Sequence, residues 1–204
     1  KETAHQIGTP LSSLIGWTTL IKEGHLPKLS IGEMENDIDR LKVITERFSK
    51  IGSNPVLEFE DLVTTINETI KYLKKRTSNL ILFKVKLSNK PVIVPINKQL
   101  LSWTLENLIK NGIDAMKGKG EINIYLEEKE KFISILISDN GEGIKNHELK
   151  KIFNPGFTSK KRGWGMGLSL AKRIVEDYHG GKIYVKKTIK TKGTTFALDL
   201  IKAT

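Results

Sequence analysis

The sequence predicts an α+β fold in two parts: an antiparallel helical hairpin, then an α/β sandwich whose sheet is covered by helices on one side. Through the first 50 residues, apolar side chains recur every three or four positions, as on helices that bury one face. After residue 53, short apolar runs that favour strands alternate with helical patterns. The turn residues Gly52-Ser-Asn-Pro55 predict the boundary between domains 1–52 and 53–204.

Two helices are expected in the first domain. Residues 1–25 form the first, which Pro10 should kink by removing a backbone donor, and a capping box at Ser30–Glu33 begins the second. Two helices of this length cannot bury two apolar faces alone, so a hairpin that dimerises into a four-helix bundle is expected. A hairpin that packs on its own second domain is the alternative. The apolar positions of the two helices are Ile7, Leu11, Leu14, Ile21, Ile31, Met34, Ile38, Leu41 and Phe48.

The second domain shows a regular succession of elements. Asn97 can cap a long helix that the glycines after Met116 end. Two strands before the glycine-rich region are expected to form a hairpin, and two near the C-terminus are expected to close the sheet. The expected strands are 56–59, 80–87, 92–94, 121–128, 132–138, 182–187 and 195–200, and the expected helices are 62–73, 97–116 and 168–178.

Composition narrows the function classes. Hydrophobic content of 38% and charged content of 28% over 204 residues are typical of a globular chain, and no run of 18 apolar residues occurs. The absence of cysteine excludes disulfides and thiol catalysis and fits a cytoplasmic protein. The four histidines lack metal-ligand spacing. The net charge of +11 allows nucleic acid as a partner, but no helix-turn-helix, zinc finger or aromatic platform accompanies it, so nucleic-acid binding is not expected.

A glycine-rich stretch, residues 139–167, organises the second domain. It lies between a strong strand and a helix, and a loop of this length in a compact domain is usually a lid or binding loop. Gly163, Gly165 and Gly167 directly precede the helix, where free N–H groups and the helix dipole favour an anion such as phosphate. Lys160, Lys161 and Arg162 add positive charge.

Five motifs follow one another in the second domain, and His5-Gln-Ile-Gly-Thr-Pro10 precedes them. Together they resemble, over essentially all 204 residues, the sensor histidine kinases, with their phospho-acceptor, N, first glycine, F and second glycine boxes in order. The five motifs are Asn107-Leu-Ile-Lys-Asn111, Asp139-Asn-Gly-Glu-Gly143, Phe153-Asn-Pro-Gly-Phe157, Gly163-Trp-Gly-Met-Gly167 and Gly193-Thr-Thr195.

The resemblance implies an ATP-binding domain of the histidine kinase, gyrase B and heat-shock chaperone type, which uses ATP and Mg²⁺. Asn111 would hold Mg²⁺, because a hard cation takes oxygen ligands and keeps phosphate oxygens and water. Asn107 would support the phosphates. Asp139 would accept a hydrogen bond from the exocyclic amino group of adenine, and Thr195 would lie near the base through water. The other nucleotide-binding positions implied are Lys110, Gly141, Gly143, Gly163, Gly165, Gly167 and Leu168.

His5 is the expected nucleophile, because a neutral imidazole nitrogen has a free lone pair that can attack the γ-phosphate. Most members of the largest subgroup carry an acidic residue after this histidine, but here it is Gln6, which can orient the ring and cannot act as a general base. Thr9 matches the position that orients water for dephosphorylating the partner. The role of Trp164, in the second glycine box, stays open.

The expected partners are a second copy of the chain and the receiver domain of a response regulator. The chain begins inside a helical pattern without methionine, which suggests a fragment whose missing upstream region carries the sensor and any membrane attachment. Two alternatives remain: another ATPase of the same superfamily, against which the His5 box argues, and an adaptor or phosphatase that has lost kinase activity, which Gln6 favours.

Overall fold

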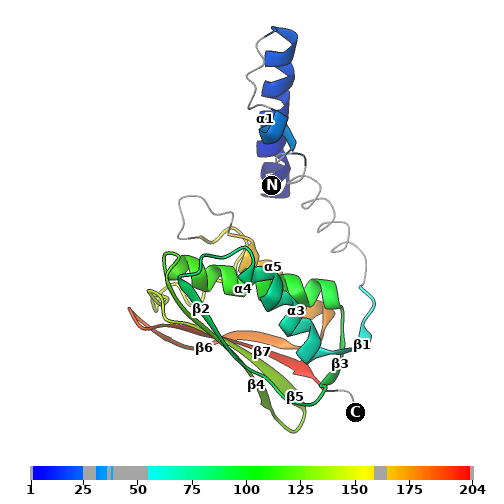
Figure 1. Cartoon of the computed structure of the whole chain (residues 1–204), viewed down its shortest axis with the longest axis vertical. Coiled ribbons are helices and arrows are strands. Elements are labelled where there is room, and N and C mark those ends of the chain that lie inside the picture. The colour runs from blue at the N-terminus through cyan, green and yellow to red at the C-terminus, as the bar shows by residue number, and fades with distance from the viewer. Residues whose placement is uncertain (1, 25–30, 36–37, 39–54, 159–164, 203–204) are drawn as a thin grey trace. The chain divides into compact units, whose positions relative to one another are not determined.

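The computed structural model describes residues 2–24, 31–35, 38, 55–158 and 165–202, with side chains from residue 12 onward. The chain divides into two compact units, Lys1–Pro55 and Val56–Thr204 (Figure 1). The predicted domain boundary at residue 52 lies outside the described residues.

The first unit contains a long helix, α1 (Glu2–Lys22), which continues through Pro10. Residues 31–35 are also helical, and the rest of the predicted second helix, apart from Ile38, lies outside the described residues. Side chains of α1 leave apolar surface in solvent: Ile15 is 58% exposed and Ile21 is 40% exposed. No helix in the described part of the chain is long and apolar enough to cross a membrane.

A five-stranded mixed sheet forms the framework of the second unit, in the order β2-β4-β5-β7-β6. Only the β2–β4 pair is parallel, and the other three pairs are antiparallel, including the predicted β4–β5 hairpin. A separate two-stranded sheet pairs β1 with β3. The strands are β1 (Glu58–Asp61), β2 (Ile81–Lys86), β3 (Ile93–Ile96), β4 (Gly120–Glu128), β5 (Phe132–Asp139), β6 (Lys182–Ile189) and β7 (Gly193–Ile201).

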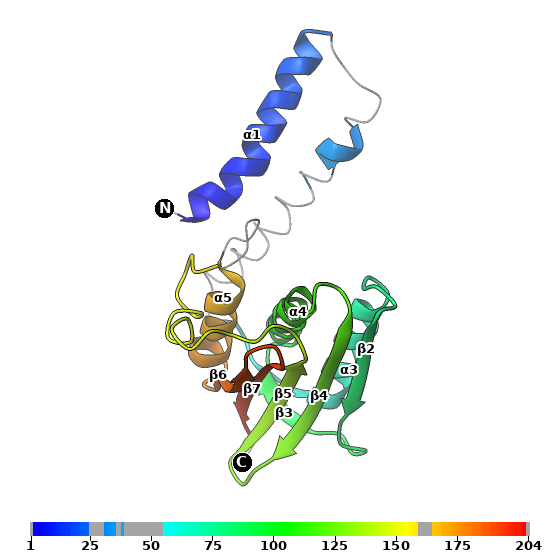
Figure 2. The ribbon, with the colours of Figure 1, turned by 90° about the vertical axis from the view of Figure 1, so that its left-hand side faces the viewer.

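The helices of the second unit lie on one face of the five-stranded sheet, as predicted (Figures 1 and 2). They are α3 (Leu62–Lys74), α4 (Lys98–Ala115) and α5 (Gly167–Arg173), and α5 continues into a π-helical turn, η1 (Ile174–Tyr178). Asn97 caps α4 as predicted, because its side chain accepts a hydrogen bond from the Leu100 N–H. The prediction of a single α-helix over 168–178 is wrong for its last five residues, because a π-helical turn forms there instead.

The core lies between these two layers. On β5 and β7, alternate residues point toward the helices, as the two-residue period of a strand requires, and β5 is buried at every position from Ile133 to Ile137. The middle of α4 packs on them with its apolar face. This packing fixes the last turns of α4 beside the end of β5. The buried residues at this contact include Leu101, Leu105, Leu108, Ile122, Ile135, Ile137 and Leu198.

Candidate functional site

A cavity of about 440 Å³ opens in the second unit, where the last turns of α4, the end of β5 and the start of α5 meet. The glycine-rich stretch predicted as a binding loop supplies much of its wall, and β7 supplies the rest. The residues that line it include Asn111, Asp139, Gly143, Phe157, Leu168 and Thr194.

Asp139 places a carboxylate in the cavity wall at the end of β5, and only 8% of the residue is exposed. Its Oδ1 accepts hydrogen bonds from the Gly141 N–H at 2.9 Å and from the Thr194 N–H at 3.3 Å. Among the described residues, Oδ2 has no such partner. Burial raises the pKa of this carboxyl above its usual value, against the lowering by backbone N–H donors of Gly141, Thr194 and Asp139 itself. The site thus holds a fixed acceptor oxygen that a ligand donor can reach.

The structure places Thr194 on the cavity and turns Thr195 away from it. Ser138 pairs with Thr195 across the β5–β7 ladder, and their hydroxyls lie 2.9 Å apart on the opposite face of the sheet. Because side chains alternate along a strand, the next pair, Asp139 and Thr194, shares the face toward the helices. The sequence interpretation chose Thr195, since strand parity depends on a register that one sequence does not show.

Two glycines that sequence reasoning did not assign to the site allow the close packing around Asp139. A Cβ added to Gly112 on α4 would lie 3.0 Å from the Asp139 Cβ and 2.9 Å from Cδ1 of Ile122. At Gly193, φ is +105° and an added Cβ would lie 1.9 Å from the Asp139 carbonyl oxygen. Gly193 stands in the motif Gly193-Thr-Thr195, which does not by itself indicate the contact with Asp139. Gly112 falls inside a helix, where a glycine otherwise costs stability. An unfavourable glycine within a predicted helix is the sequence feature that could have indicated the close packing at Gly112.

The glycines of the first box serve mainly the packing of the loop. A Cβ on Gly141 would meet the backbone of Ala115 at 2.7 Å, and a Cβ on Gly143 would meet the Ile189 carbonyl oxygen at 2.5 Å. Gly143 also lines the cavity. These two positions therefore hold the loop close to both α4 and the end of β6.

Asn107, Asn111 and Lys110 differ in their surroundings on α4. Asn111 lines the cavity. The Asn107 side chain lies against Gly167 at the start of α5, and its Nδ2 is buried without a hydrogen-bond partner among the described residues. A buried amide without an acceptor is costly, so Asn107 fits a ligand oxygen at this helix N-terminus. Lys110 is exposed and pairs with Glu106 one turn earlier.

Around the glycine-rich loop, the F-box aromatics join the core. Phe153 packs edge-to-face on Phe196, with ring centroids 6.4 Å apart, and Phe157 lines the cavity. The loop closes on itself where the Gly156 N–H donates to the Gly165 carbonyl at 3.0 Å. Leu168, in the first turn of α5, adds an apolar wall. Residues 159–164, which include Gly163, Trp164 and the basic cluster 160–162, lie outside the described residues.

The predicted phospho-acceptor residues belong to the other unit. His5, Gln6 and Thr9 are on α1, and their side chains are outside the described part of the chain. No group of three or more His, Asp or Glu side chains able to hold a metal occurs within the described ranges. A divalent cation beside Asn111 would therefore depend on ligand oxygens and water for most of its coordination.

The sequence of this chain resembles those of known ATPases and kinases. The family described as histidine kinase-, DNA gyrase B-, and HSP90-like ATPase matches residues 97–204, from the cap of α4 to the C-terminus. Sporulation kinase D of Bacillus subtilis is 31% identical over 206 residues, which cover 97% of this chain and 40% of that protein. Sensor histidine kinase ZraS of Escherichia coli is 32% identical over 205 residues, which cover 97% of this chain and 43% of that protein.

Solved structures also resemble this chain beyond the matched family region. The crystal structure of histidine kinase ThkA in complex with the response regulator protein TrrA has 27% sequence identity and a TM-score of 0.72, and the match covers 98% of this chain and 60% of that one. The chain spans only about two fifths of the curated relatives, 40% and 43% of their lengths.

Proposed function

This chain belongs to the histidine kinase-, DNA gyrase B- and HSP90-like ATPases, and from that premise we propose that it is the dimerisation and catalytic core of a sensor histidine kinase. It would bind ATP with Mg²⁺ in the second unit, phosphorylate His5 in the first, and pass the phosphoryl group to an aspartate of a response regulator. Relatives named as sensor and sporulation kinases, which align over 97% of the chain, support this proposal.

The observation that carries the nucleotide proposal is the buried Asp139 carboxylate. Its Oδ1 is occupied by two backbone donors, and its Oδ2 has no partner among the described residues. The exocyclic amino group of adenine would donate a hydrogen bond to the Oδ2 of this carboxylate. Guanine presents a carbonyl oxygen at that position, which would repel the carboxylate. Thr194, rather than Thr195, would contact the base through water, because Thr194 lines the cavity.

The phosphate end of the nucleotide would lie toward α5. Asn107 offers an unpaired buried amide against Gly167, and the start of α5 offers free N–H groups. Asn111 would provide an oxygen ligand to Mg²⁺ without adding negative charge near the triphosphate. The cation would supply charge neutralisation during transfer. Lys110 would act only through its long-range charge, since it is exposed and paired with Glu106.

His5 would attack the γ-phosphate in line through a neutral imidazole nitrogen. A nitrogen–phosphorus bond would form as the bond between the γ-phosphorus and the β,γ-bridging oxygen of ATP breaks, and ADP would leave with that oxygen. The proton of the imidazole would leave to water, because Gln6 cannot accept it. The phosphoramidate formed is reactive enough to transfer its phosphoryl group to a carboxylate. Thr9, one helical turn after His5, would orient water in the reverse, dephosphorylating reaction.

The partners follow from the same proposal. One similar structure is a histidine kinase in complex with a response regulator protein. We propose that this chain also binds a receiver domain, and that its helical hairpin dimerises into a four-helix bundle. The chain would work in the cytoplasm, with any membrane attachment through a region upstream of it.

Phosphorylation with γ-labelled ATP and Mg²⁺ tests the proposal. The wild-type chain should incorporate label that resists alkali and is lost in acid, which is the signature of phosphohistidine. His5→Ala should take up no label and still bind ATP, because the nucleotide site lies in the other unit. Label that persists in His5→Ala would contradict the assignment of the nucleophile, and failure of the wild type to bind ATP would contradict the nucleotide site.

One observation favours a second function. Gln6 replaces the acidic residue found in most of the largest subgroup, so the chain would serve as an adaptor or phosphatase for the regulator if proton removal from His5 is too slow. Under the kinase proposal, Gln6→Glu should label faster than wild type at equal ATP affinity. A chain that binds ATP but takes up no label, with or without this substitution, would favour the adaptor function.

A further inference from the structure

We propose that Thr188, on β6 and outside every nucleotide-binding motif, is a positioning residue that sets the affinity for the nucleotide base by holding the first glycine loop against β7. This inference rests on the proposed function, since it assigns a role at the same nucleotide site. Thr188 lies in the hairpin formed by β6 and β7.

A bulge in β6 places Thr188 on the face of the sheet that carries the cavity. The register of β6 on β7 shifts between Val185 and Lys187, so that Lys186 is the extra residue. In a regular strand that continued from Val185, position 188 would point to the opposite face. The extra residue reverses the alternation, and Thr188 becomes the partner of Thr194, which lines the cavity.

The Thr188 hydroxyl connects the loop to β7. Its Oγ1 accepts a hydrogen bond from the Ile144 N–H at 2.8 Å, immediately after the first glycine box. Its own hydrogen points to the Thr194 Oγ1 at 3.1 Å or the Gly193 carbonyl at 3.4 Å. Ile144 and Thr194 both line the cavity, so one hydroxyl bonds to two of its walls.

The same contact reaches the carboxylate that would bind the base. The Thr194 N–H donates to Asp139 Oδ1, so Thr188 is linked to Asp139 through a single residue. A displacement of Thr194 would move a donor that fixes the direction of the carboxylate. Because Thr188 does not itself line the cavity, it acts on the ligand only through Ile144 and Thr194.

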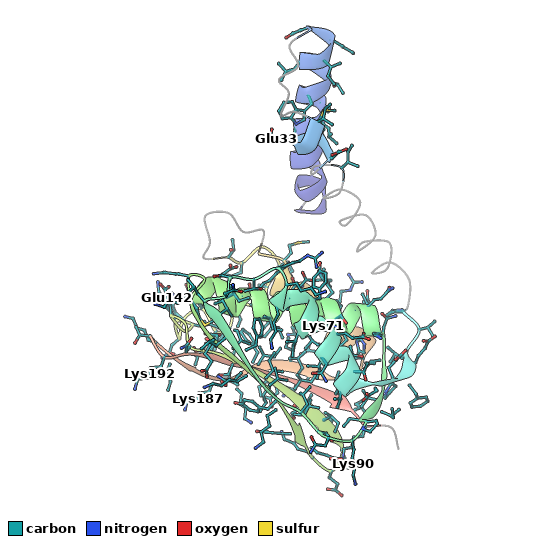
Figure 3. All side chains as sticks on the ribbon, viewed as in Figure 1. Glu33, Lys71, Lys90, Glu142, Lys187 and Lys192 are labelled. Atoms are coloured by element: carbon teal, nitrogen blue, oxygen red, sulfur yellow. The ribbon has the colours of Figure 1, made fainter. Side chains whose placement is uncertain are left out.

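Other contacts of the β6–β7 hairpin confine the loop but do not replace this one. The Thr191 N–H donates to the Glu142 carbonyl at 2.8 Å, and Gly143 packs on the Ile189 carbonyl. Figure 3 shows Glu142 at the same end of the second unit as Lys187 and Lys192 of the hairpin. These are backbone contacts at Glu142 and Gly143, whereas Thr188 provides the side-chain acceptor for the next residue, Ile144.

The experiment compares Thr188→Val, Thr188→Ser and Thr69→Val in the whole chain, with Mg²⁺ and ADP as the titrated ligand. Valine keeps the shape and removes the acceptor for Ile144, and serine keeps the hydroxyl and removes the methyl group. Thr69→Val is the matched control: its buried hydroxyl donates to the Thr65 carbonyl within α3, away from the cavity. Calorimetry measures Kd, and initial labelling rates over a range of ATP concentrations separate KM from kcat.

Thr188→Val should raise Kd for ADP and KM for ATP about tenfold, because it leaves the Ile144 N–H without its acceptor and loosens the loop. Thr188→Ser and Thr69→Val should stay within about twofold of wild type. The value of kcat should not change, since Thr188 touches no reacting atom. Thermal unfolding of the ligand-free variants shows whether Thr188→Val and Thr69→Val lose similar stability.

Wild-type affinity in Thr188→Val would overturn the inference and leave the proposed function intact. So would an equal loss in Thr188→Ser, since the methyl group and not the hydroxyl would then matter. An equal loss in Thr69→Val would also overturn it, because the effect would come from general destabilisation. Absence of ADP binding by the wild-type chain would overturn the proposed function and this inference with it.

Discussion

At the scale of single residues, burial of the Asp139 carboxylate costs folding stability, and the same carboxylate is the group proposed to bind the adenine base. Burial disfavours its charged form and raises its pKa, while backbone N–H groups favour the charge but do not cancel the desolvation cost. A raised carboxyl pKa means that its favourable contribution to stability is present at low pH and is lost as the pH rises through the folded-state value. In the ligand-free protein the charged form of this carboxyl is thus only partly compensated, and a hydrogen-bond donor from the ligand would stabilise it.

Asp139→Asn should separate binding from stability. The amide oxygen can still accept from Gly141 and Thr194, but the amide nitrogen then faces the adenine amino group, donor against donor. We expect ATP affinity to fall by about 2–3 kcal/mol, roughly a hundredfold in Kd. The free energy of unfolding of the ligand-free variant should not fall at pH 7, because the neutral side chain removes the desolvation cost.

Calorimetry and urea denaturation of the same samples check both parts. Asp199→Asn is a suitable control for binding, since Asp199 accepts from the Ser134 hydroxyl on the opposite face of the sheet. Unchanged affinity in Asp139→Asn would remove the carboxylate from the base site.

Residue types were easier to predict from the sequence than side-chain directions. Asp139 and Asn111 stand in recognisable motifs, and the structure brings both to one cavity. The choice between Thr194 and Thr195 depends on strand parity, which the β5–β7 register decides. The role proposed for Thr188 could not be predicted from the sequence, because a bulge before it reverses the alternation of side chains along β6 and no motif contains it.

At the scale of elements, the start of α4 is tied to the end of α5 and η1 by a buried histidine. His179 is 5% exposed, and its Nε2 accepts from the Asn97 N–H at 3.0 Å. Its Nδ1–H donates to the Ile174 carbonyl at 2.7 Å. The neutral ring thus links the N-cap of α4 to the C-terminal end of η1, and burial lowers its pKa.

The pH dependence of stability should show this link. A lowered folded-state pKa means that the unfolded chain binds a proton first, so the contribution of His179 is intact above about 6.5 and declines as the pH falls below that value toward the folded-state pKa. Urea denaturation at a series of pH values should show this loss in wild type. His179→Gln, which does not titrate, should lack that component. If the free energy of unfolding changed with pH in the same way in wild type and His179→Gln, the role assigned to His179 would be contradicted.

Most helices and strands could be predicted because the spacing of their apolar residues agrees with the positions of the capping and turn residues at their ends. The alternation of β4 and β5 and the cap at Asn97 gave the correct element types, with ends displaced by one or two residues. The π-turn over Ile174–Tyr178 was missed, since its apolar spacing is close to that of an α-helix. His179 ends this turn, and its long-range bond to Asn97 joins residues 82 positions apart, which no local pattern reveals.

At the scale of the whole molecule, each of the two units has part of the proposed activity. The second unit contains the cavity and the residues proposed to bind the nucleotide, whereas His5 belongs to the first. The proposal therefore separates nucleotide binding from phosphate acceptance. The first unit also differs in its surface, since its described helical residues leave several large apolar side chains in solvent: Ile15, Leu20, Ile21, Ile31 and Ile38.

We expect the whole chain to be a dimer and the fragment Val56–Thr204 to be a monomer. Helices with unpartnered apolar faces gain free energy by burying them against a second copy, at about 25 cal/mol per Å² of apolar surface. Sedimentation equilibrium over a range of concentrations should give twice the chain mass of 23.0 kDa for the whole protein. Ile15→Lys should weaken the dimer, because it places a charge on a residue that is 58% exposed in the single chain.

Ser12→Lys is the matched control, since it adds the same charge at an exposed polar position of the same helix. A dimer that withstands Ile15→Lys would contradict an interface that contains Ile15, and equal weakening by both substitutions would mean that added charge on this face, and not the loss of Ile15, weakens the dimer. The fragment should bind ADP as tightly as the whole chain, because the residues that line the cavity all belong to the second unit. A monomeric whole chain would contradict the four-helix bundle, and weaker ADP binding by the fragment would mean that the nucleotide site needs the first unit.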